Sequence, residues 1–164
     1  MPGQALALVE PLTELSWADD TSAAALTEKR RGIRSAPSGG QITLKLEGTV
    51  PDWMDQVLDG LSDLLKLPND WDGYGGAPIS ERIVRDSVLT LLMVAQPSSP
   101  PPCVVPLGSG GVQLEWHRRG LHLEIEIYPG EAPTFNCHND QGEVAEGSLP
   151  ADRAGLREII RGLA

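Results

Sequence analysis

Two runs of alternating residues, separated by a two-residue turn, constrain the fold of this chain more than any other feature. Residues 112–117 alternate apolar with polar side chains, residues 121–128 do so again, and Arg119-Gly120 lies between them. A period of two is typical of a strand with one buried face, and a two-residue loop containing glycine favours a tight hairpin. If the turn is centred on Arg119-Gly120, the directly opposite pairs are Gln113 with Glu126, Glu115 with Glu124 and His117 with His122.

The remaining periodicity predicts three amphipathic helices and several more strands. Helical spacing of apolar residues covers 52–66, 81–95 and 152–163, and strand-like runs cover 41–47, 104–105, 134–137 and 143–146. Asp52 is placed to cap the first helix or to complement its dipole, and Ser80 is placed to cap the second. The order of elements predicts an α+β fold. We expect an antiparallel meander of about five strands, with two to three helices packed on one face.

Residues 1–40 differ in composition from the rest, which predicts a tail followed by one α+β domain over residues 41–164. The segment contains the basic cluster Lys29-Arg30-Arg31 with Arg34, and it ends in a Ser-, Pro- and Gly-rich run. Such composition is typical of a flexible linker. Residues 6–17 are apolar enough to dock on a partner, and we expect the tail to order there on binding.

The chain begins without a basic region followed by a long apolar run, and no stretch approaches the ~18 apolar residues of a membrane span. We therefore expect a cytoplasmic protein that has no membrane contact. Its two cysteines, Cys103 and Cys137, are then expected to be reduced thiols.

The charge balance favours a basic protein partner over a nucleic acid. The sequence has 23 acidic and 13 basic residues, giving a net charge of −10 and a pI near 4.6. Direct nucleic-acid binding requires Lys and Arg against phosphates and is not expected here. Solubility alone, or mimicry of nucleic-acid charge, also accounts for the acidity. One acidic stripe lies opposite the apolar face of the first helix and consists of Asp52, Asp55, Asp59 and Asp63.

A loop rich in Asp, Gly and aromatic residues joins the first two helices. It reads Pro-Asn-Asp-Trp-Asp-Gly-Tyr-Gly-Gly-Ala-Pro over residues 68–78 and lacks the full ligand set of an EF-hand. Asn69 and Asp70 can bond local backbone, and the glycines of the loop can supply positive φ. In this interpretation Trp71 and Tyr74 anchor the loop on the core. The alternative is a recognition loop in which Trp71, Asp72 and Tyr74 contact a partner.

The polar face of the hairpin places like charges opposite each other, and something is expected to offset them. Glu115 opposes Glu124, with Glu126 one step further along the strand. A basic partner, an Arg from the tail, or a metal ion held by His117, His122 and one Glu would all do so. A solvated face that tolerates the repulsion is the simplest alternative. Adjacent Cys137 and His138 point to opposite faces and make poor joint ligands.

Three segments of the sequence together resemble a group of small bacterial proteins. They are the motif Trp71-Asp72-Gly73-Tyr74-Gly75 with Pro78, residues 110–116 (Gly-Gly-Val-Gln-Leu-Glu-Trp), and the Ile-Glu-Ile strand. The resemblance covers about residues 58–130 and leaves the tail outside. The group has no established activity, so the resemblance implies no catalytic residues.

These observations together favour a non-enzymatic protein-binding module of accessory, immunity or antitoxin type. It would act through the acidic surface and the aromatic loop, without a cofactor. The alternatives are a small metal-dependent hydrolase or nuclease that uses the His/Glu face, and an acidic mimic of nucleic acid. No catalytic residue is assigned, and His117 and His122 are the candidate metal ligands.

Overall fold

The structure is a computed structural model that describes residues 29–34, 41–46 and 50–164. In chain order the strands and helices are as follows: β1 (Lys29–Arg34), β2 (Gln41–Leu46), α1 (Met54–Leu64), α2 (Glu81–Val94), β3 (Cys103–Pro106), β4 (Val112–Arg118), β5 (Leu121–Ile127), β6 (Thr134–Asn139), β7 (Gly142–Ser148) and α3 (Arg153–Gly162). No helix within these residues is long and apolar enough to cross a membrane.

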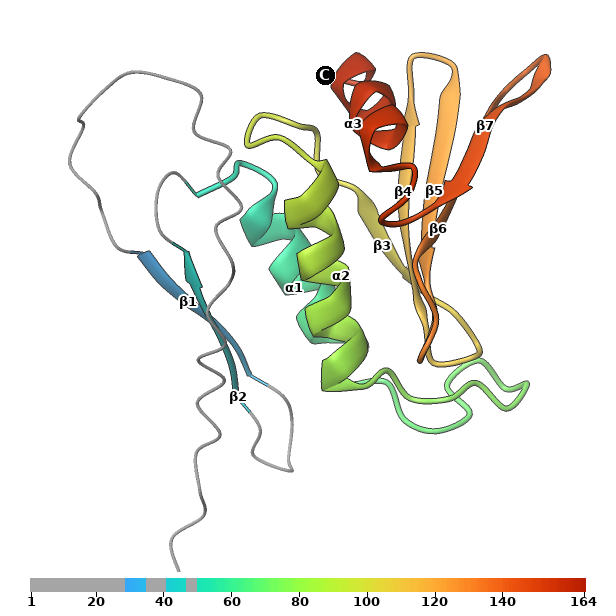
Figure 1. Cartoon of the computed structure of the whole chain (residues 1–164). Coiled ribbons are helices and arrows are strands. Elements are labelled where there is room, and N and C mark those ends of the chain that lie inside the picture. Colours follow the sequence, from blue (N-terminus) through green and yellow to red (C-terminus); the bar gives the residue numbers. More distant parts are fainter. Residues whose placement is uncertain (1–28, 35–40, 47–49) are drawn as a thin grey trace, which may run out of the picture.

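Strands β3 to β7 form one antiparallel five-stranded sheet in sequential order, and α1, α2 and α3 lie on one side of it (Figure 1). This confirms the predicted α+β meander. The residue pairs predicted across the β4–β5 hairpin are also those observed. Arg119 and Gly120 both have positive φ, of 54° and 72°. The turn therefore has the backbone of a two-residue hairpin whose twist matches that of the strands.

The predicted strand near residue 41 exists, but it lies outside the main sheet. Strand β2 pairs antiparallel with β1 in a separate two-stranded sheet. Residues 29–34, which composition placed in the tail, thus form a strand because β2 supplies partners for their backbone. The rest of the predicted tail, including the apolar piece over residues 6–17, lies outside the described residues.

The two N-caps predicted from sequence have different outcomes. Ser80 Oγ accepts a hydrogen bond from the Ile83 N–H at 3.3 Å and caps α2, which confirms that prediction. The cap of α1 is Trp53, which makes no side-chain capping bond, so the capping role of Asp52 was wrong. Asp52 lies one residue too early, and its backbone N–H donates instead to Pro97 O at 2.9 Å.

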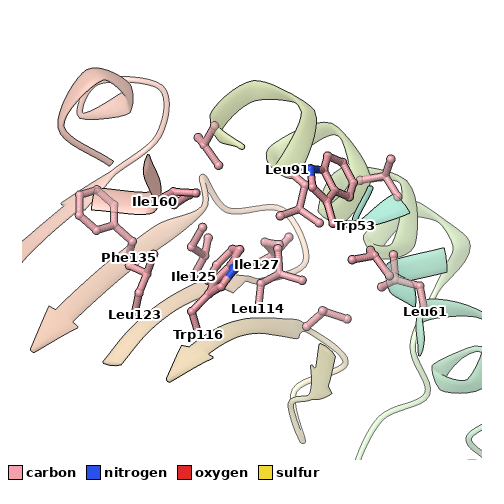
Figure 2. Close-up of a cluster of buried hydrophobic side chains, with 14 of the residues drawn as sticks. Trp53, Leu61, Leu91, Leu114, Trp116, Leu123, Ile125, Ile127, Phe135 and Ile160 are labelled. Carbon is pink, nitrogen blue, oxygen red and sulfur yellow. The ribbon is translucent and has the colours of Figure 1, made fainter. Parts of the chain in front are cut away.

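The core fills the space between the helices and the sheet (Figure 2). Two tryptophans also fix the proline-rich connector between α2 and β3. Trp53 Nε1 donates to Gln96 O at 2.9 Å, and Trp116 Nε1 donates to Pro100 O at 2.8 Å. Both indoles are at most 2% exposed, so each buries its polar atom with a partner. The connector is thereby tied to the same core that holds the sheet.

One glycine marks a tight contact where β7 leads into α3. A Cβ on Gly147 would lie 2.6 Å from an Asp152 carboxylate oxygen and 2.8 Å from the Phe135 ring. That carboxylate accepts the Ser148 N–H at 2.8 Å and so closes the turn into α3. A side chain at position 147 would force the Asp152 carboxylate and the Phe135 ring to move.

Candidate functional site

The side of the sheet that faces away from the three helices carries polar side chains, and it is called the open face below. Its residues on the three central strands are Gln113, Glu115, His117, His122, Glu124, Glu126, Thr134, Asn136 and His138. They alternate with fully buried residues such as Leu114, Leu123 and Ile125. The sequence prediction that the His, Gln and Glu side chains of the hairpin point away from the core is confirmed.

Carboxylates dominate the open face. Glu115 lies directly opposite Glu124, and Glu126 lies opposite Gln113. Glu124 and Glu126 also line an open hollow of about 510 Å³ together with Glu146 and Asp152. The pKa of Tyr128 is raised by burial and by its neighbour Glu126. Negative charge is therefore concentrated at the end of the sheet where β5, β6 and β7 meet the turn into α3.

Four of the Lys and Arg side chains of residues 50–164 form ion pairs away from the open face. Their ion pairs are Lys66 with Asp63, Arg82 and Arg85 with Asp86, and Arg161 with Glu158. Arg119 Nη1 donates to Gly162 O at 3.5 Å, and Arg153 Nε donates to Met93 O at 3.1 Å. Within residues 50–164, the open-face carboxylate that meets an imidazole is Glu115, whose Oε2 lies 3.2 Å from His117 Nε2.

All three histidines of the sequence meet in one row across β4, β5 and β6. His117 Nδ1 lies 2.6 Å from His122 Nδ1, and the His122 and His138 rings stack with centroids 5.0 Å apart and planes 7° apart. His138 was not among the residues predicted for a site. The signal that locates His138 is the pairing of β5 with the strand predicted at 134–137. When that strand is extended by one residue, its register places His138 opposite His122.

The geometry limits the chemistry of this row. Within the described part of the chain, no group of three or more His, Cys, Asp or Glu side chains is arranged to hold one metal ion. Cys137 is buried on the opposite side of the sheet from His138, as predicted, and burial raises the pKa of its thiol. A buried neutral thiol is a poor nucleophile.

The loop between α1 and α2 is held by its own aspartates. Asp72 Oδ1 accepts hydrogen bonds from the N–H groups of Tyr74 and Gly76, both at 2.8 Å. These bonds, that from Tyr74 first, lower the pKa of Asp72. Asp70 Oδ1 accepts the Gly75 N–H at 2.7 Å. The local hydrogen bonding predicted for Asp70 is confirmed, and the positive φ predicted for the glycines is found at Gly73 and Gly75. The bonds to Asp72 were not predicted from the sequence.

The two aromatic residues of the loop differ in their surroundings. Trp71 is partly buried and donates Nε1–H to Ala77 O at 3.2 Å, whereas Tyr74 is 95% exposed. The prediction that both rings anchor the loop on the core was therefore wrong for Tyr74. The backbone of residues 73–76 wraps around the Asp72 carboxylate, and this turn directs ring 74 outward. The loop adjoins the β3–β4 turn, where Ala77 N–H donates to Gly108 O at 2.9 Å.

The acidic stripe on α1 faces outward as predicted. All four of its members, Asp52, Asp55, Asp59 and Asp63, are exposed. Asp63 pairs with Lys66 at 2.6 Å. The stripe lies on a helix and does not belong to the open face of the sheet. The predicted binding residues thus fall on three surfaces: the open face, the aromatic loop and the outer side of α1.

No protein-family model matches this chain, and no curated protein or solved structure matches it either.

Proposed function

We propose that this chain is a non-enzymatic protein-binding module that engages a basic partner through the open face of its sheet. The observation that carries the proposal is the direct opposition of Glu115 and Glu124 on neighbouring strands. Like charges in that arrangement destabilise a strand pair. A basic side chain placed between them would convert repulsion into two attractions.

The hollow lined by Glu124, Glu126, Glu146 and Asp152 supports the same partner chemistry. It adds carboxylates next to the opposed pair, so the negative potential extends over several strands. Complementary charge raises association rates and selects partners of the opposite sign. A Lys- or Arg-rich protein surface is the ligand that fits this face.

The aromatic loop is the second contact in this proposal. Three carboxylate–amide bonds order the loop, and yet its outermost ring, Tyr74, is 95% exposed. Tyrosines are enriched among the residues that dominate binding energy at interfaces. A ring on a preorganised loop loses little conformational entropy when it docks.

The test compares two variants that remove the same charge. The tagged full-length chain serves as bait in native cell extract at low salt, and bound proteins are quantified by mass spectrometry. Glu115→Gln/Glu124→Gln removes the opposed pair, and Asp140→Asn/Glu158→Gln removes two exposed charges that lie outside the three predicted binding surfaces. The proposal expects a basic protein that is retained by wild type and by the control but lost with the face variant. Equal retention by both variants would contradict a role for the open face.

The loop contact has its own comparison. Tyr74→Ala removes the exposed ring, and Val144→Ala trims the other large exposed apolar side chain of the described residues, which is 51% exposed on β7. We expect Tyr74→Ala alone to reduce retention of the same basic protein. If both substitutions leave retention unchanged, the loop is not part of the interface.

A further inference from the structure

We propose that His117 and His122 form a binding site for one divalent transition-metal ion such as Zn²⁺ or Cu²⁺. The two residues lie directly opposite each other on β4 and β5, next to the Arg119-Gly120 turn that fixes their register. Their Nδ1 atoms are 2.6 Å apart, and their rings meet at 75°. Two nitrogen atoms thus converge on one point at the rim of the sheet.

Glu115 sets the orientation of the first ligand. Its Oε2 lies 3.2 Å from His117 Nε2. An ionised carboxylate only accepts hydrogen bonds, so Nε2 carries the hydrogen and Nδ1 of the neutral ring presents its lone pair. The same carboxylate–imidazole arrangement orients histidine ligands in metal sites. His117 therefore aims a lone pair at His122 Nδ1.

Two lone pairs that face each other at this distance repel unless something lies between them. In the metal-free protein a hydrogen on His122 Nδ1 fills that place. When a metal ion takes its position, neutral His122 carries its hydrogen on Nε2 and offers a second lone pair. With metal–nitrogen bonds of about 2.1 Å in tetrahedral geometry the two nitrogens lie roughly 3.4 Å apart. The His117 side chain is 49% exposed, so a small rotation can open the pair to this separation.

The third histidine stays outside this site. The His138 ring stacks parallel to His122 with centroids 5.0 Å apart, so an ion in the plane of one ring lies well out of the plane of the other. This agrees with the finding that no three ligating side chains of the described residues share one ion. Two imidazoles with water in the remaining positions suit Zn²⁺, Cu²⁺ and Ni²⁺ and do not suit Mg²⁺ or Ca²⁺.

The experiment is titration calorimetry of the full chain, free of any histidine tag, with Zn²⁺ and with Cu²⁺, and Mg²⁺ as the negative control. We expect one site per chain. His122→Gln should lower the affinity at least tenfold, and Glu115→Gln should lower it about 10- to 100-fold through loss of orientation. His138→Gln and Cys103→Ser should stay within about twofold of wild type, because neither side chain is a ligand. Electron paramagnetic resonance of the Cu²⁺ form should show two coordinated nitrogens.

Three results would overturn the site. One is an affinity of wild type no greater than that of His117→Gln/His122→Gln. Another is loss of binding in Cys103→Ser, which would assign the ion to the exposed thiolate. The third is loss in His138→Gln with His122→Gln unaffected. Because all these residues lie on the solvent side of the sheet, melting temperatures of the variants show that each is folded. The site does not depend on the proposed partner, so each proposal can fail alone.

Discussion

The opposition of Glu115 and Glu124 predicts that the charge proposed for binding destabilises the free protein. Replacing Glu124 with Gln removes one carboxylate charge and keeps the shape of the side chain. The fold should then become more stable, while retention of a basic partner should weaken. A residue that contributes only to folding would not give this combination.

The magnitude follows from the strand geometry. Side chains of directly opposite residues place two carboxylates about 6 Å apart, and in water their repulsion is about 0.7 kcal/mol. Cross-strand pairs contribute about 0.2–1 kcal/mol, which agrees. For a domain of this size Tm changes by about 2–4 °C per kcal/mol, so we expect a rise of roughly 1–3 °C. At 1 M salt the Debye length is about 3 Å, and most of the gain should disappear.

Urea and thermal unfolding at low and high salt measure both parts of the prediction. Asp140→Asn, at the exposed β6–β7 turn, removes the same charge without an opposed carboxylate and is the matched control. In the Glu115→Gln background the gain from Glu124→Gln should shrink, because the directly opposite carboxylate no longer contributes to the repulsion. A loss of stability in Glu124→Gln, or a gain that is independent of salt and of Glu115, would refute the reasoning.

Further predictions concern two glycines, the two cysteines and Asp72. Gly147→Ala should destabilise by about 1–3 kcal/mol in urea unfolding, because the new methyl group meets a carboxylate and a ring. Gly155→Ala, in open space on α3, should instead stabilise by about 0.5–1 kcal/mol. A thiol reagent should label exposed Cys103 at once and Cys137 only on unfolding, and equal labelling of both would contradict the buried position. Backbone hydrogen bonds lower the pKa of Asp72, so its contribution to loop order is complete above the ordinary value of 3.8 and is lost as the pH falls below it. The protection of the loop amides, which is their exchange rate relative to the intrinsic rate at the same pH, should then fall in acid. Unchanged protection would argue against this role.

The fold was predictable where a periodic pattern coincided with a marked turn. The alternation on both sides of Arg119-Gly120 was enough to give the register of β4 and β5 residue by residue. The pairing of β2 was not predictable, because its partner β1 lies in a basic, linker-like segment with no apolar periodicity. Composition reports the average character of a segment, whereas strand pairing depends on where the other strand lies.

The site was predictable only in part. Glu115, Glu124, His117 and His122 followed from the hairpin register, but His138 required the neighbouring pair of strands as well. The exposure of Tyr74 had no signal in the sequence. Whether a ring on a short loop turns inward or outward depends on the path of the backbone. That path is set here by hydrogen bonds to Asp72 that residue type alone does not specify.

The two-residue turn at Arg119-Gly120 has a consequence for how this protein can evolve. Because side chains alternate, the residues that build the core and those that display chemistry are different sets on the same strands. Substitutions on the outer set can accumulate and change specificity while the inner set stays constant. A single-residue insertion or deletion at the turn would exchange the two sets at once. Lineages that retain this fold should therefore vary freely in the displayed residues and keep the length of the turn fixed.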